Sequence, residues 1–139
     1  MRKMLSLSAV TILALVVVTG VALAQKPGAH VLTEPVCTID NGTITCTGGA
    51  GAGLGNQAVI VSASAPAGCG TKPNSNNPPG HAQFTSEPID PRAGRINFPT
   101  FTLSADCPPG LVSFIGTVVT YEVRTASGVL ILSFTVTAS

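Results

Sequence analysis

The stretch Val36-Cys37-Thr38-Ile39-Asp40-Asn41-Gly42-Thr43-Ile44-Thr45-Cys46 carries the strongest fold signal in the chain. Its Asn41-Gly42 pair favours a type I′ turn, because both residues tolerate positive φ angles. A two-residue turn at that position pairs Cys37 with Cys46 and puts both side chains on the apolar face of a β-hairpin. The pair falls at a non-hydrogen-bonded position, where Cα atoms lie about 4.5 Å apart. A disulfide between the two cysteines would therefore be tight.

Much of the remaining chain alternates between apolar and polar residues with the period of a half-buried strand. The clearest segments are Ala58–Ala65, Ala82–Ser86, Arg95–Ala105, Leu111–Val123 and Val129–Ala138, with a short edge strand expected at Val31–Thr33. Seven or eight short strands without helical periodicity predict an all-β fold, an antiparallel β-sandwich of Ig-like general form. A small closed β-barrel is the alternative architecture.

Proline and glycine predict where two of these strands are interrupted. Within Arg95–Ala105 the apolar parity changes between Phe98 and Phe101, and Pro99 stands at the change. We therefore expect a β-bulge or a strand switch at Pro99. Gly116 is expected to kink the strand that follows Leu111.

The N-terminus has the order of a secretory signal peptide. An apolar run from Leu5 to Val18 follows two basic residues and precedes the small-residue site Ala22-Leu23-Ala24. This pattern predicts a signal peptide at residues 1–24, cleaved after Ala24, with an uncleaved membrane anchor as the alternative. We expect a leader at residues 25–35 and a single β-sandwich domain at residues 36–139.

The charge of the expected mature chain excludes two classes of partner. Seven Lys and Arg less the two in the signal peptide leave five, against six Asp and Glu, so the net charge is −1. Nucleic acid needs clustered Lys and Arg to neutralise its phosphates, and anionic membranes also attract basic segments. We expect no nucleic-acid partner, and no membrane association after signal cleavage.

Four cysteines in an exported domain predict two disulfides, for which three connectivities exist. We favour Cys37–Cys46 together with Cys69–Cys107. In the chain-entropy model the longer loop contributes about 4 kcal/mol to the free energy of unfolding and the hairpin loop about 2.5–3 kcal/mol. Loss of the longer bridge should therefore cost more stability.

A glycine-rich stretch, Gly48–Asn56, follows the hairpin and is expected to be an irregular loop. Its Gly53-x-Gly55-x-x-Ala58 formally matches a dinucleotide fingerprint, but that motif must open a helix, and here a β-branched strand follows. The elements Cys46-Thr47-Gly48, Gly53-Leu54-Gly55-Asn56, a Val/Ala strand, Cys69 and Asn76-Asn77-Pro78-Pro79-Gly80 resemble those of small exported bacterial proteins of unassigned function. The resemblance spans roughly residues 36–107. It implies a secreted β domain and supplies no active site.

Pro66–His81 is the longest segment predicted to be irregular, and it is dense in Pro, Asn and Gly. Loops of this length in compact domains are usually functional or disordered, and Cys69 would tether this one. We take it as the candidate binding loop, with Asn74, Asn76, Asn77 and His81 as its candidate contact residues.

The sequence shows none of the familiar constellations of catalysis. His30 and His81 stand alone rather than in a metal-binding motif, and no G-x-S-x-G nucleophile elbow occurs. Glu87 and Asp90 are the closest carboxylate pair, but a proline-flanked extended segment does not make them converge. The chain has no Trp and one Tyr, which disfavours an aromatic sugar platform. We expect no catalytic residues, cofactor or metal.

These patterns together predict a secreted, non-enzymatic β-sandwich stabilised by two disulfides. We expect it to act as a surface binding or structural module toward an extracellular or cell-envelope partner whose identity the sequence does not give. The alternative is a small extracellular hydrolase or metal-dependent enzyme built on the 66–81 loop, using His81, Glu87 or Asp90. A third possibility is a polymer subunit whose exposed edge strands pair between chains.

Overall fold

The computed structural model describes residues 23–24, 27–70 and 80–139, and all the regular secondary structure in these ranges is β-strand. Among these residues every strand pairing is antiparallel and no sheet closes into a barrel, so the protein is an antiparallel β-sandwich and the barrel alternative is wrong. One layer is a six-stranded sheet of β1 (Leu23–Ala24), β12 (Leu130–Thr137), β11 (Val118–Thr125), β6 (Val59–Gly70), β10 (Val112–Ile115) and β7 (Gly80–Thr85). Within the described ranges no helix is long and apolar enough to span a membrane.

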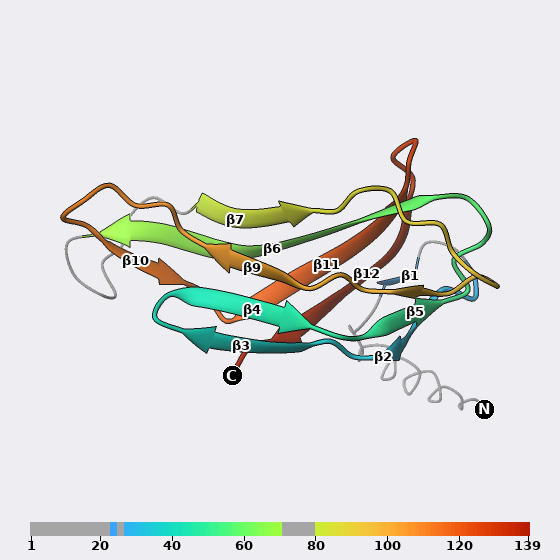
Figure 1. The fold of residues 1–139 in the computed structure, drawn as a ribbon, viewed down its shortest axis with the longest axis horizontal. Coiled ribbons are helices and arrows are strands. Elements are labelled where there is room, and N and C mark those ends of the chain that lie inside the picture. The colour runs from blue at the N-terminus through green and yellow to red at the C-terminus, as the bar shows by residue number, and fades with distance from the viewer. Residues whose placement is uncertain (1–22, 25–26, 71–79) are drawn as a thin grey trace, which may run out of the picture.

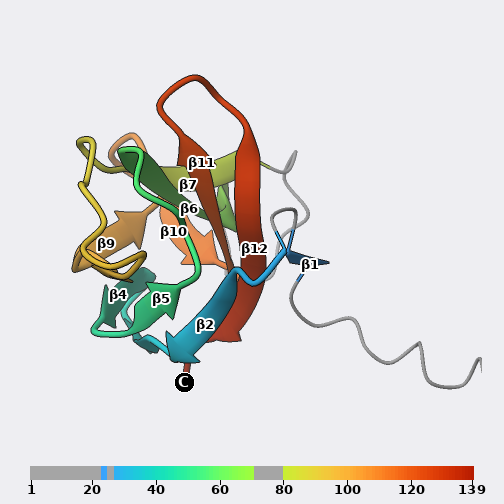
Figure 2. The same ribbon diagram turned by 90° about the vertical axis from the view of Figure 1, so that its right-hand side faces the viewer.

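The opposite layer consists of two three-stranded sheets (Figures 1 and 2). One contains β2 (His30–Thr33), β5 (Ala50–Ala52) and β8 (Ile96–Asn97), and the other contains β3 (Val36–Asp40), β4 (Thr43–Thr47) and β9 (Phe101–Ser104). Figure 1 shows the two sheets following each other along the molecule. They are two halves of one layer, because β2 leads into β3, β4 into β5, and β8 into β9 after short breaks.

The hairpin of β3 and β4 forms in the predicted register, with Cys37 opposite Cys46. Asn41 and Gly42 take φ angles of 52° and 77°, as a type I′ turn requires. The Cys37–Cys46 disulfide, called here the hairpin disulfide, spans a Cα–Cα distance of 4.0 Å, so the expected close approach is confirmed.

The strand switch expected at Pro99 is confirmed. β8 pairs with β5, whereas β9 pairs with β4, so the chain changes sheets between Asn97 and Phe101. At the same level the backbone N–H of Phe98 donates to the carbonyl of Gly49, at 3.0 Å. A Cβ on Gly49 would lie 2.7 Å from the nitrogen of Pro35, so only glycine fits there. The three breaks that divide this layer therefore contain proline or glycine: Pro35 between β2 and β3, Gly48 and Gly49 between β4 and β5, and Pro99 between β8 and β9.

Two segments predicted to be irregular are strands. β6 continues through Pro66 to Gly70, and Pro66 pairs with His81 at the start of β7. Pro66 is tolerated because its neighbour is interrupted there: β10 and β11 both pair with β6, and the chain breaks between them. The interruption falls at Gly116 and Thr117, where we expected a kink, and the N–H of Gly116 donates to the carbonyl of Pro66, at 2.7 Å.

The second correction is β5, which lies inside the glycine-rich stretch that we expected to be a loop. Its middle residue, Gly51, leaves room for the ring of Phe98, whose nearest carbon would be 3.2 Å from a Cβ at that position. Glycine therefore serves packing here rather than flexibility.

The core lies between the layers and is centred on four aromatic rings. Tyr121 stacks on Phe134 with ring centroids 4.8 Å apart, and Phe98 and Phe101 pack against Tyr121 at 5.5 and 5.6 Å. The alternation of residues 129–138 predicts that Leu130, Leu132, Phe134, Val136 and Ala138 face the core, and the last four are buried. Leu130 is only half-buried and Ile131 is buried instead, because the register shifts opposite Val123 and Arg124. These contacts fix the relative position of the loops at the ends of the sandwich.

Candidate binding groove

The structure describes only part of the predicted binding loop, residues 66–70 and 80–81. Asn74, Asn76 and Asn77 fall in residues 71–79, which lie outside the described residues. Of the four candidate residues the structure places His81, which is exposed near the start of β7.

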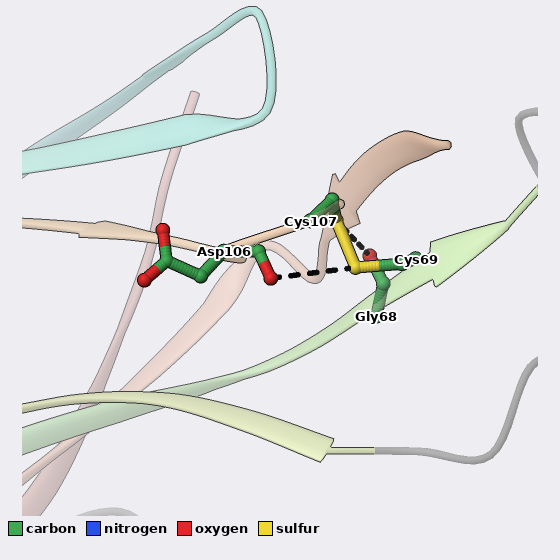
Figure 3. Close-up of a disulfide and its surroundings, with 4 residues drawn as sticks. All are labelled: Gly68, Cys69, Asp106 and Cys107. Carbon is green, nitrogen blue, oxygen red and sulfur yellow. Dashed lines mark hydrogen bonds between the residues drawn. A yellow bond between two sulfur atoms is a disulfide. The ribbon is translucent and has the colours of Figure 1, made fainter. Parts of the chain in front are cut away.

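The base of that loop is fixed by the Cys69–Cys107 disulfide, called here the long-range disulfide (Figure 3). It joins β6 to the segment that precedes β10, with a Cα–Cα distance of 5.7 Å. The sulfur of Cys69 lies 3.9 Å from the carbonyl oxygen of Asp106, and the sulfur of Cys107 lies 3.8 Å from that of Gly68. Both predicted disulfides are therefore present.

His81 lines a shallow polar hollow of about 360 Å³ on the outer face of the six-stranded sheet. The hollow also contains Ser64 and Glu122. Glu122 is engaged by Arg124, whose guanidinium lies 3.0 Å from a carboxylate oxygen of Glu122. In the described part of the chain no hydrogen bond joins His81 to Ser64 or Glu122, so the three residues share a face without forming a nucleophile–base pair.

The other candidate chemical residues are dispersed. His30 lies on β2, in a different sheet from His81, and its Nδ1 is 2.7 Å from the carbonyl oxygen of Gly28. Asp90 lines a separate surface depression with Arg92 and Arg95, and Glu87 is exposed. Across residues 23–24, 27–70 and 80–139 no group of three or more His, Cys, Asp or Glu side chains is arranged to hold a metal ion.

A larger concavity, called here the end groove, holds about 800 Å³ and lies at one end of the sandwich. It runs between the loop that follows β5 and the turn that joins β11 to β12. Its lining residues are Pro27, Leu54, Gly55, Asn56, Gln57, Thr125, Ser127, Val129, Leu130 and Ile131. None of these residues is charged, and the volume lies in the range typical of small-molecule sites.

One wall of the end groove is held by glycine. Leu54 is 2% exposed, and it stands between Gly53 and Gly55, which have φ angles of 74° and 85°. The N–H of Leu54 donates to the carbonyl of Gly94, at 3.0 Å, which anchors the loop. A Cβ on Gly53 would lie 2.1 Å from the carbonyl oxygen of Gly28, so this approach of two chain segments requires glycine.

The opposite wall is the turn between β11 and β12, which its own side chains hold in place. The Thr125 hydroxyl lies 2.9 Å from the Ser127 hydroxyl and accepts a hydrogen bond from the N–H of Val129, at 3.0 Å. The guanidinium of Arg124 donates to the carbonyl of Gly128, at 3.2 Å. Both walls are therefore held by hydrogen bonds within the chain, a property that favours binding because little conformational entropy is lost.

Sequence reasoning missed the end groove, because its residues come from a glycine loop and a turn that carry no catalytic motif. The available signals were the lone apolar Leu54 among glycines and the apolar Val129 beside a turn.

Comparison of the chain with protein-family models, with curated proteins and with solved structures finds no match.

Proposed function

We propose that the protein is an exported, non-enzymatic binding module whose ligand occupies the end groove. The observation that carries this proposal is the uncharged groove itself, which has a floor of Leu130 and Ile131 and a rim of Asn56, Gln57 and Ser127. An apolar floor with a few polar groups is the usual composition of a small-molecule site. The ligand class that fits is a neutral, partly apolar molecule or peptide segment, since a charged group would be desolvated without a partner.

Export supports this reading. The order of basic, apolar and small residues at the N-terminus is that of a cleaved signal peptide, and two disulfides are typical of extracellular proteins. A scaffold with two covalent bridges suits a module that works through its surface, outside the cell or at the cell envelope.

The test is a titration of the exported protein with the neutral fluorescent probe N-phenyl-1-naphthylamine. Ser127 is exposed on the groove rim, so Ser127→Arg puts a long charged side chain into the groove without disturbing the core. Ser104→Arg, at an exposed position on β9 outside the groove, is the matched control. We expect Ser127→Arg to weaken probe binding about tenfold or more, which corresponds to at least about 1.4 kcal/mol. Absence of probe binding, or equal loss in both variants, would contradict the proposal.

A further inference from the structure

A short hairpin at residues 92–95 lies in the segment that joins β7 to β8, which crosses from the six-stranded sheet to the opposite layer (Figure 1). Arg92 and Arg95 each donate a backbone N–H to the carbonyl of the other, at 2.9 and 3.0 Å. Ala93 and Gly94 form the turn, with φ angles of 52° and 76°, as a type I′ turn requires. The backbone therefore places the two arginines directly opposite each other.

Backbone hydrogen bonds fix this hairpin to both layers of the sandwich. On its N-terminal side, Ile89 exchanges hydrogen bonds with Val59 of β6, at 2.8 and 2.9 Å. On its C-terminal side, Ile96 pairs with Gly51 of β5. The position of the hairpin is therefore set by the sandwich and does not depend on contacts between the arginine side chains.

The two arginines form a like-charge pair. Directly opposite residues of an antiparallel pair have side chains on the same face, with Cβ atoms about 4.5–5.5 Å apart, and like charges there are destabilising. Both side chains are exposed, and in the described part of the chain neither forms a salt bridge. Arg124, the third arginine of these ranges, is paired with Glu122 at 3.0 Å. Arg92 and Arg95 thus differ from Arg124 in lacking an acidic partner among the described residues.

Both arginines line one depression of about 410 Å³, together with Asp90, Asn97 and two isoleucines. Each guanidinium group is a planar fork of N–H donors that matches the geometry of an oxyanion. The amide of Asn97 supplies further N–H donors. The carboxylate of Asp90 opposes an anion in the same depression, so the site is electropositive because of the two arginines.

We propose that this depression binds an oxyanion, the carboxylate or phosphate group of a ligand, between Arg92 and Arg95. An anion placed between two guanidinium groups replaces their repulsion by two charge-assisted interactions. The inference goes beyond the proposed function, because the end groove has no charged lining residue and was assigned a neutral ligand. Two arginines suit a single anionic group, whereas nucleic acid and anionic membranes attract longer clusters of basic residues.

The test is a titration of the isotope-labelled exported protein with sodium phosphate at neutral pH, followed by NMR spectroscopy of the backbone amides. Sodium chloride keeps the ionic strength constant, so that the screening of charges does not change. We expect the amide signals of residues 92–97 to shift along a saturating curve. Sodium acetate, titrated in the same way, shows whether a phosphate or a carboxylate is the preferred anion. Absence of a saturable shift at the hairpin with both salts would overturn the proposal.

Variants assign the binding to the two arginines. Arg92→Gln and Arg95→Gln should each weaken phosphate binding about fivefold or more, because each removes one of two ion pairs. Arg92→Lys should retain part of the affinity, since lysine keeps the charge but lacks the planar fork. Asp90→Asn should strengthen binding, because it removes a negative charge from the depression. Arg124→Gln, outside the depression, is the matched control, and an equal loss in this variant would overturn the proposal.

A second measurement separates a binding site from a structural role of the same residues. A double-mutant cycle on urea denaturation, with Arg92→Gln, Arg95→Gln and the double variant, gives the coupling free energy between the two side chains. In sodium chloride this coupling should be unfavourable, as for like charges. Phosphate should make it favourable, because the bound anion attracts both side chains. A coupling that phosphate leaves unchanged would overturn the oxyanion site but not the end groove.

Discussion

Replacing Tyr121 by Phe should make the protein more stable. The Tyr121 side chain is fully buried on β11, and within the described residues its hydroxyl has no hydrogen-bond partner. Burying a hydroxyl without a partner costs about 1–3 kcal/mol. The void left by one oxygen atom, roughly 10 Å³, costs only about 0.2 kcal/mol at the usual cavity coefficient. We therefore expect Tyr121→Phe to raise the free energy of unfolding by about 1–2 kcal/mol.

Tyr121 should also make the free energy of unfolding depend on pH in the alkaline range. Burial raises the pKa of Tyr121 well above its ordinary value of 10.0. The unfolded chain therefore loses the phenolic proton near pH 10 while the folded protein keeps it. The free energy of unfolding is therefore unaffected by this proton below pH 10. It then falls by about 1.4 kcal/mol per pH unit as the pH rises above 10, because the unfolded chain has lost the proton. The Tyr121→Phe variant should lack this decline.

The assay is urea denaturation followed by far-ultraviolet circular dichroism, at neutral pH and at a series of values above pH 10. Phe134→Leu is the matched control, because it removes the ring that stacks on Tyr121 and should lower the free energy of unfolding by about 1 kcal/mol or more. If Tyr121→Phe lowered stability by 1 kcal/mol or more, the hydroxyl would have to be satisfied in solution, and the reasoning would fail.

Two further expectations follow from the same structure. Replacing both cysteines of the long-range disulfide by Ala should cost about 4 kcal/mol, against about 2.6 kcal/mol for the hairpin disulfide; urea denaturation of the two double variants checks the order, and a reversed order contradicts it. Gly53→Ala should cost about 1–3 kcal/mol more than Gly48→Ala. The two glycines have φ angles of 74° and 73°, but a Cβ meets a carbonyl oxygen only at Gly53. Equal melting temperatures for these two variants would contradict that expectation. The probe experiment described above tests the groove.

Local chemistry explains which parts of the fold were predictable. The Asn41-Gly42 turn sets the register of its hairpin, because a two-residue loop leaves one pairing that buries Ile44 and both cysteines. The strand switch at Pro99 was visible for a similar reason, since a change of parity can be accommodated only where the backbone changes direction. Both signals lie within about ten residues of sequence.

The missed elements depend on contacts between distant residues. Pro66 looks like the end of a strand unless the break at Gly116, fifty positions later, is known to lie beside it. Gly51 looks like a loop residue unless the ring of Phe98 is known to cover it. The end groove has the same origin, because its two walls come from segments about seventy residues apart that no local pattern connects.

One wall of the proposed end groove lies close to the predicted cleavage site, and this has a consequence for the proposed ligand site. Leu130 and Ile131, where β12 begins, line the end groove. Pro27, which lines the groove, is only three residues from Ala24. Cleavage after Ala24, which the sequence predicts, would leave the Pro27 wall close to a chain end, whereas the wall at Leu54 stays anchored through Gly94. We therefore expect binding at the proposed ligand site to depend on Leu54 and the turn at Ser127 far more than on Pro27.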